Sequence, residues 1–253
     1  FQKGMRGMLK ILIFLVFVTS SFDILLNLNL GGFNVRTCYL AAFAFIFIYA
    51  GQFKDASRFR FIGIGSFLIW FLLMTAFVWN TQFLMRNIGY VAWLCFNMFA
   101  CYAIYKYSQL KSANDLIRIY VLSFFVMALV GLAQFMLSTV GIHVLITMWW
   151  KINKIPRVNA LSYEPSYYAT YLLIGFVFLY FTQRRGIWFF KQKMQILILS
   201  TVAIAIFLST SRMGILFMVS ILLYDFAKLM IRALFTWRIS RVNFFIAIFF
   251  SNY

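Results

Sequence analysis

Residues 157–173 read RVNALSYEPSYYATYLL, and the stretch passes from a polar loop into a long apolar run at Glu164 and Pro165. Glu164 is the only glutamate in 253 residues. Proline suits the first helical position and an acidic residue is favourable beside a helix N-terminus, so the stretch predicts a helix that begins at Pro165. It also raises the question of why a chain that nearly avoids negative charge places a carboxylate here, seven residues after Arg157.

The rest of the chain is too apolar for a water-soluble fold. Hydrophobic residues make up 64% of it, aromatic residues 21% and charged residues only 11%. One soluble domain cannot bury that much apolar surface, so the lipid bilayer is the expected solvent. We interpret the net charge of +18 as a topology signal and an attraction to the anionic inner leaflet. A nucleic-acid partner is not expected.

The apolar runs predict a single all-α domain over residues 1–253, a polytopic bundle of transmembrane helices. A crossing needs about 17 to 25 mostly apolar residues. Eight complete spans are expected, at residues 9–26, 37–53, 61–78, 88–105, 119–140, 165–181, 194–210 and 213–230. A ninth begins at residue 242 and is cut off at residue 253, so we interpret the chain as truncated at its C-terminus.

The basic residues orient these spans. Seventeen of the 23 lysines and arginines fall in the N-terminal segment and in the second, fourth, sixth and eighth loops, and six fall on the other side. Since cytoplasmic loops carry the excess of basic residues, the N-terminus is predicted to be cytoplasmic.

The fifth loop, residues 143–164, is the exception to this charge pattern. It lies on the outer side and carries three basic residues, Lys151, Lys154 and Arg157. Basic residues there oppose the topology signal, so another requirement must retain them. An anionic ligand meets that requirement, because lysine and arginine bind phosphate and arginine offers a planar fork of donors.

The seventh loop, residues 209–213, holds a second outer arginine. It is a tight hairpin tip around the sequence STSR, in which Ser211 is predicted to cap the next helix. Arg212 then lies in the first helical turn, where the helix dipole disfavours a cation. A neighbouring anion again explains its position.

Structural interpretations of the same residues stay open at this stage. Arg157 can be solvated in a long loop, and Arg212 can extend to lipid phosphates. Glu164 can serve only as a helix start. Gln134 and Asn97 are interpreted as interhelical hydrogen-bond partners. His143, at an outer helix end, is interpreted as interfacial and not catalytic.

The order and spacing of these motifs resemble a known family. R-x6-EPS-xx-A precedes a span, and an STSR hairpin follows about 45 residues after the Glu-Pro pair, over roughly residues 120–225. This arrangement resembles the O-antigen ligase and O-antigen polymerase (Wzy-type) superfamily. Its members are polytopic membrane enzymes of the bacterial inner membrane that transfer an oligosaccharide from an undecaprenyl-diphosphate carrier to an acceptor hydroxyl at the outer face. The usual large outer loop with a histidine motif is absent here, and His143 does not match it.

The resemblance implies roles at matching positions. Arg157 and Arg212 are expected to hold the carrier's diphosphate. Glu164 is expected either to activate the acceptor hydroxyl or to fix Arg157, and a neighbouring arginine would keep its carboxyl ionised, which favours the second role; Asp23 is the second choice as base. The remaining candidate substrate-binding residues are Lys154, Tyr163, Ser166, Tyr167 and Ser211. Apart from the resemblance, Tyr163, Tyr167, Tyr168 and Tyr171 can form an aromatic platform for sugar rings, and packing within the span is the favoured alternative.

The expected activity is therefore that of a metal-independent glycosyltransferase without a cofactor. It joins undecaprenyl-diphosphate-linked repeat units during surface polysaccharide (O-antigen, lipopolysaccharide or capsule) biosynthesis. The rival within the class is a ligase that moves glycan to lipid A-core or to a protein, and the rival from another class is a transporter or flippase of a lipid-linked substrate. The expected partners are the carrier-linked oligosaccharide, the acceptor hydroxyl, the bilayer and, within the family resemblance, a chain-length regulator protein.

Overall fold

The fold is taken from a computed structural model of the chain. It describes residues 2–21, 28–30, 33–35, 37–50, 69, 71–75, 84–110, 113–146, 148–151 and 155–236. The chain forms two compact units, one of residues Phe1–Val16 and Asn27–Leu116 and one of residues Phe17–Leu26 and Ile117–Tyr253.

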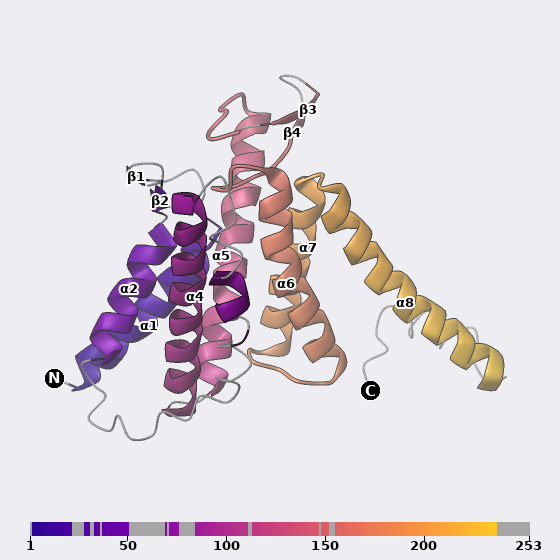
Figure 1. The fold of residues 1–253 in the computed structure, drawn as a ribbon. Coiled ribbons are helices and arrows are strands. Elements are labelled where there is room, and N and C mark those ends of the chain that lie inside the picture. Colours follow the sequence, from indigo (N-terminus) through magenta and orange to yellow (C-terminus); the bar gives the residue numbers. More distant parts are fainter. Residues whose placement is uncertain are drawn as a thin grey trace. The chain divides into compact units, whose positions relative to one another are not determined.

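In the described part of the first unit, the long helices (Figure 1) are α1 (Gln2–Thr19), α2 (Thr37–Ala50) and α4 (Leu84–Leu110). Residues 71–75 are also helical, and β1 (Leu28–Leu30) and β2 (Phe33–Val35) form a short antiparallel pair of strands. The helices α2 and α4 pack through aromatic rings. Phe45 and Tyr49 stack at 5.6 Å, and the ring of Tyr107 meets each of them edge-on at 5.9 Å. Lys10 forms an ion pair with Asp115 over 2.7 Å, which joins α1 to the first turn of the helix that follows α4 along the chain.

The second unit contains α5 (Ala113–Thr139), α6 (Pro165–Arg184), α7 (Gln192–Leu208) and α8 (Arg212–Thr236). A hairpin of β3 (Trp149–Lys151) and β4 (Ile155–Pro156) lies between α5 and α6, and Trp149 pairs with Pro156. The helices α6, α7 and α8 alternate in direction and α6 contacts both of the others. The loop before α6 and the turn between α7 and α8 therefore lie at the same end of this unit (Figure 1).

Helices α5 and α6 pack through large side chains, and a glycine makes room for one of them. Gly175 of α6 lies directly against the ring of Phe124. Tyr168 is fully buried and donates to the main-chain oxygen of Met127 over 3.1 Å. Tyr171 donates to the main-chain oxygen of Phe17 at 2.9 Å and lies 3.2 Å from the hydroxyl of Ser123. Small residues and hydroxyl contacts of this kind join helices in apolar surroundings, where the hydrophobic effect is weak.

The opposite end of the second unit is held by charged and amide groups. Arg118 at the start of α5 donates to the main-chain oxygen of Phe189 over 2.7 Å. Gln195 of α7 binds the same turn through the main-chain nitrogen of Phe189 at 2.9 Å and the main-chain oxygen of Ile187 at 3.2 Å. Arg184 of α6 forms an ion pair with Asp225 of α8. The start of α5, the turn between α6 and α7 and the ion pair between α6 and α8 therefore lie at this end of the unit.

The helical class predicted from the sequence is confirmed for the described residues, and the four short strands are an addition to it. Three helical stretches are long and apolar enough to cross a membrane, Asn87–Ser108, Ala113–Thr139 and Arg212–Ile231. Shorter apolar helices occupy Gly7–Thr19, Thr37–Tyr49 and Gln192–Leu208. The predicted span at 61–78 falls largely, and the start of a ninth at 242–253 entirely, outside the described residues. Eight spans and a cytoplasmic N-terminus stay predictions.

The first predicted span, 9–26, is wrong at its C-terminal end. The helix α1 ends at Thr19. The hydroxyls of the next two residues turn back onto it, with Ser20 donating to the main-chain oxygen of Phe17 at 2.7 Å and Ser21 to that of Val18 at 3.3 Å. Serine hydroxyls compete in this way with the helical ladder, which explains the early end.

The contact between Gly175 and Phe124 predicts the effect of one added methyl group. Gly175→Ala should lower the free energy of unfolding by about 1–3 kcal/mol, because a Cβ there meets a buried ring. Thermal unfolding followed by circular dichroism in detergent measures the effect, and adding Phe124→Leu should restore part of the loss. Gly7→Ala, where a Cβ meets nothing within 4 Å, is the matched control. An unchanged melting temperature for Gly175→Ala would contradict the contact between Gly175 and the ring of Phe124.

Candidate functional site: an arginine pocket between the fifth loop and the α7–α8 turn

The fifth loop and the α7–α8 turn are joined directly. The main-chain nitrogen of Val158 donates to the main-chain oxygen of Leu208 over 3.3 Å. One residue earlier, Arg157 donates from Nε to the hydroxyl of Thr210 over 2.8 Å. Two segments about 50 residues apart in sequence therefore form one surface.

Gln134 of α5 anchors the loop beside Arg157. Its Oε1 accepts from the main-chain nitrogens of Asn159 at 3.1 Å and Ala160 at 2.8 Å. Its Nε2 donates to the main-chain oxygen of Val144 at 2.9 Å. All of these are bonds from a helix to a loop, so the prediction of an interhelical role for Gln134 is wrong. Asn97 also departs from that prediction, because it donates to the main-chain oxygen of Trp93 in its own helix.

Asn159 extends the same network, and sequence reasoning missed it. Its Nδ2 donates to the main-chain oxygens of Leu145 at 3.1 Å and Ser162 at 2.6 Å. Ser162 in turn donates from its hydroxyl to the main-chain oxygen of Ser21 over 2.7 Å. Asn159 and Ser162 are both fully buried. The sequence gives two signals for this network. Gln134 is a carboxamide inside an apolar helix, and Asn159 is a second carboxamide, two positions after Arg157.

The start of α8 is capped as predicted. The hydroxyl of Ser211 accepts from the main-chain nitrogen of Gly214 over 3.4 Å, and its main-chain oxygen accepts from the nitrogen of Ile215 over 2.9 Å. Ser211 is buried, so its hydroxyl is committed to this cap. The expected contact of Ser211 with a substrate is therefore not supported.

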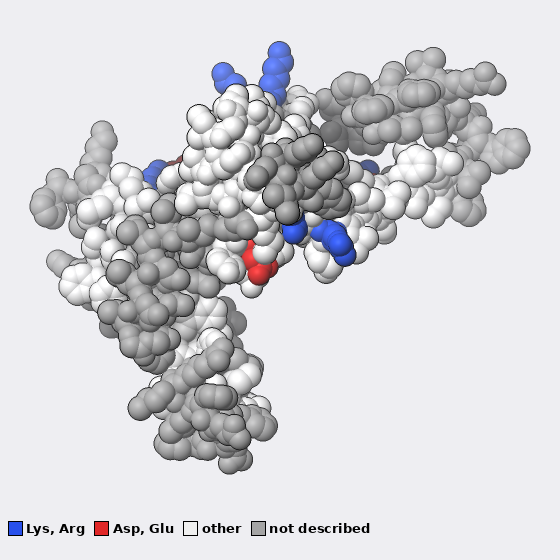
Figure 2. Space-filling view, turned by 90° about the horizontal axis from the view of Figure 1, so that it is seen from above, with Lys and Arg blue, Asp and Glu red and all other residues white. Residues whose placement is uncertain are grey.

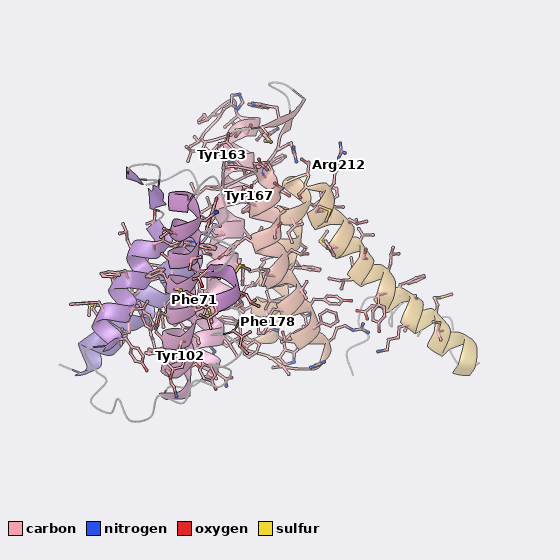
Figure 3. The ribbon with its side chains drawn as sticks, viewed as in Figure 1. Phe71, Tyr102, Tyr163, Tyr167, Phe178 and Arg212 are labelled. Carbon is pink, nitrogen blue, oxygen red and sulfur yellow. The ribbon has the colours of Figure 1, made fainter. Side chains whose placement is uncertain are left out.

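Arg212 follows immediately as the first residue of α8, and its side chain is exposed. Figure 3 shows it at the same end of the second unit as Tyr163 and Tyr167. Within the part of the chain that the structure describes, it makes no hydrogen bond and no ion pair. Its guanidinium donors are therefore unpaired among these residues.

A pocket of about 280 Å³ joins the two arginines, and its lining residues are Trp149, Arg157, Thr210 and Arg212. No carboxylate is among these four residues, so nothing in the lining neutralises the two positive charges. Viewed from above, the described surface carries few charged side chains and is mainly uncharged (Figure 2). Two guanidiniums in one small pocket favour an anion with several oxygen atoms, such as a phosphate or diphosphate.

The guanidinium of Arg157 is only partly satisfied by the protein. Besides the hydroxyl of Thr210, it contacts the main-chain oxygen of Thr210 from Nη2 at 3.5 Å and the sulfur of Met148 from Nη1 at 3.7 Å. A guanidinium has five N–H donors, so about two remain, one on each terminal nitrogen. A pair of this kind is suited to two oxygens of one anion.

Glu164 begins α6 as predicted but does not fix Arg157. It occupies the residue before Pro165, and its main-chain oxygen accepts from the nitrogens of Tyr167 at 3.1 Å and Tyr168 at 3.3 Å. Its carboxylate accepts from the hydroxyl of Ser166 over 2.9 Å and makes no capping bond to the backbone. The role of fixing Arg157 belongs to Thr210. Glu164 is not part of the pocket lining, and its role as a base stays a prediction.

The predicted aromatic platform divides into two pairs. Tyr168 and Tyr171 make the contacts between helices described above, so the alternative of packing within the bundle is confirmed for these two. Tyr163 is 61% exposed and Tyr167 is 56% exposed, and both lie at the start of α6 (Figure 3). Lys154, the remaining expected ligand residue, lies outside the described residues.

His143 packs against Trp149, one of the residues that line the pocket. The Nδ1 of His143 is 3.2 Å from the hydroxyl of Ser138, and its ring meets that of Trp149 edge-on at 4.7 Å. Trp149 forms part of the pocket wall. Among the described residues no group of three or more histidine, cysteine, aspartate or glutamate side chains is placed to hold a metal ion.

Comparison of the chain with protein-family models, with curated proteins and with solved structures finds no match.

The Gln134 network predicts how the loop responds to loss of its anchor. Gln134→Leu keeps the volume but removes the acceptor for the main-chain nitrogens of Asn159 and Ala160, and a buried donor without a partner costs about 1–3 kcal/mol. Hydrogen exchange of these two amides should become faster by about tenfold or more, measured by mass spectrometry in nanodiscs. Asn97→Leu, which removes a carboxamide bonded within its own helix, should leave exchange at these amides unchanged. Slow exchange at both amides in Gln134→Leu would contradict the anchoring role.

Proposed function

We propose that this chain is part of a membrane glycosyltransferase of the O-antigen polymerase type. It transfers undecaprenyl-diphosphate-linked oligosaccharide units to an acceptor hydroxyl at the outer face of the bacterial inner membrane. The observation that carries the proposal is that Arg157 and Arg212 line the same pocket. The sequence indicates each of them independently, one in the fifth loop and one in the seventh.

The pocket supports a role in stabilising the leaving group. In the proposed step the acceptor oxygen forms a bond to the anomeric carbon, and the bond from that carbon to the carrier phosphate breaks. The diphosphate leaves with the electron pair, and the hydroxyl proton passes to a base. Preorganised cations at the position where negative charge develops are among the strongest catalytic devices known in enzymes. Two guanidiniums beside the diphosphate are suited to that task.

The position of the pocket favours this proposal over a transporter. A transporter is expected to bind its substrate near the bilayer midplane between repeated halves of the chain. Here the pocket is formed by a loop and a helix start at one end of α6, α7 and α8, and the sequence shows no internal repeat. A ligase that transfers glycan to lipid A-core or to a protein uses the same diphosphate site and stays the alternative within the class.

The arginine pocket predicts the outcome of complementation. In a strain that lacks surface polymer, the full-length protein with Arg157→Ala or Arg212→Ala should lose long glycan chains, with activity reduced by about a hundredfold or more. Arg157→Lys should also fail largely, because lysine keeps the charge but lacks Nε and the planar fork. The measurement is the polymer ladder at matched membrane abundance.

Arg185→Ala is the matched control, because Arg185 is exposed at the opposite end of α6. It should leave the ladder intact. An unchanged ladder with Arg157 and Arg212 both replaced by alanine would exclude the diphosphate role of the pocket.

Glu164 can be tested by two substitutions that separate position from proton transfer. Glu164→Gln should keep most of the activity, since the carboxamide oxygen still accepts from Ser166 and Glu164 lies outside the pocket lining. Glu164→Ala should lower it further, because the first turn of α6 loses this contact. Initial rates with carrier-linked substrate measure both. A loss of about a hundredfold or more in Glu164→Gln would instead establish Glu164 as the base.

A further inference from the structure

Thr210 adopts a backbone conformation that its side chain disfavours. Its φ is +50°, in the left-handed region. A β-branched residue rarely occupies this region, where glycine and asparagine are favoured. Strain of this kind persists only where the surroundings impose it, and it gathers at functional sites.

The surroundings of Thr210 are rigid enough to impose the conformation. Its main-chain nitrogen donates to the main-chain oxygen of Phe207 over 3.0 Å. Its neighbours Ser209 and Ser211 are buried, and their hydroxyls are bonded to the main chain within this turn and the first turn of α8. The tip therefore has little freedom to relax.

In this left-handed conformation, two oxygen atoms of Thr210 accept hydrogen bonds from the guanidinium of Arg157. The hydroxyl accepts from Nε of Arg157 at 2.8 Å, and the main-chain oxygen accepts from Nη2 at 3.5 Å. The hydroxyl also donates to the main-chain oxygen of Ser209 at 2.8 Å, which fixes its own orientation. One residue thus holds one side of the guanidinium, and one N–H on each terminal nitrogen is left for the pocket.

We propose that Thr210 is a positioning residue, which holds the guanidinium of Arg157 so that its two uncommitted N–H donors face a bound diphosphate. The inference rests on the proposed function of the pocket. It also explains why threonine is present in place of glycine. Glycine would relieve the strain, but it lacks the hydroxyl that orients Arg157.

Strain and positioning predict opposite effects of one substitution. Thr210→Gly in the full-length protein removes both the strain and the hydroxyl, so the melting temperature should stay equal or rise while affinity for inorganic diphosphate falls about tenfold. Thr210→Ser keeps the hydroxyl and should bind within about twofold of the unchanged protein. Isothermal calorimetry in detergent measures the affinity, and differential scanning fluorimetry measures the melting temperature.

Leu145→Gly is the matched control, because Leu145 also has a left-handed backbone, with φ +54°, and lies outside the pocket lining. It should change the melting temperature in the same sense without weakening diphosphate binding. Unchanged affinity in Thr210→Gly, or a parallel fall of affinity and melting temperature in Thr210→Gly and Thr210→Ser, would overturn the positioning role.

The failure of the proposed function has a different signature. If Arg157→Ala binds inorganic diphosphate as tightly as the unchanged protein does, the pocket is not the anion site, and the role of Thr210 falls with it. If Arg157→Ala loses binding and Thr210→Gly does not, the anion site stands and only the inference about Thr210 is overturned.

Discussion

The contact between Arg157 and Thr210 is the point on which the candidate site depends. It joins a loop that follows α5 to a turn that follows α7, over 2.8 Å between Nε and the hydroxyl. Together with the main-chain bond from Val158 to Leu208, it holds the segments of the two arginines against one another. With it, Arg157 shares a pocket with Arg212, and the free side of its guanidinium is available to a ligand.

That contact needs a loop whose backbone is already fixed. Gln134 and Asn159 supply this by binding main-chain groups on both sides of the loop, and Ser162 ties it to Ser21. In apolar surroundings each unpaired main-chain group is costly, so a buried loop must satisfy its polar atoms internally. The carboxamides thus fix the loop and, by the same bonds, place Arg157.

The sequence predicted the helical class, the helix start at Pro165, the cap at Ser211 and the two arginines as a candidate pair. These rest on local signals, namely apolar run length, turn chemistry and a charge on the unexpected side. The partners of the arginines could not be predicted in the same way. Gln134 meets Asn159 across 25 residues, and no propensity marks a threonine for a left-handed conformation. The four tyrosines near Pro165 show the same limit, because only the packing of α5 against α6 decides which of them are buried.

The most direct measurement of the central claim is a cryo-electron microscopy map of the full-length protein in nanodiscs loaded with undecaprenyl diphosphate. We predict density for the phosphates within hydrogen-bond distance of both Arg157 and Arg212, beside Trp149, with the Arg157 guanidinium still bonded to Thr210. Phosphate density at another site, with the pocket between the two arginines filled by water alone, would contradict the account.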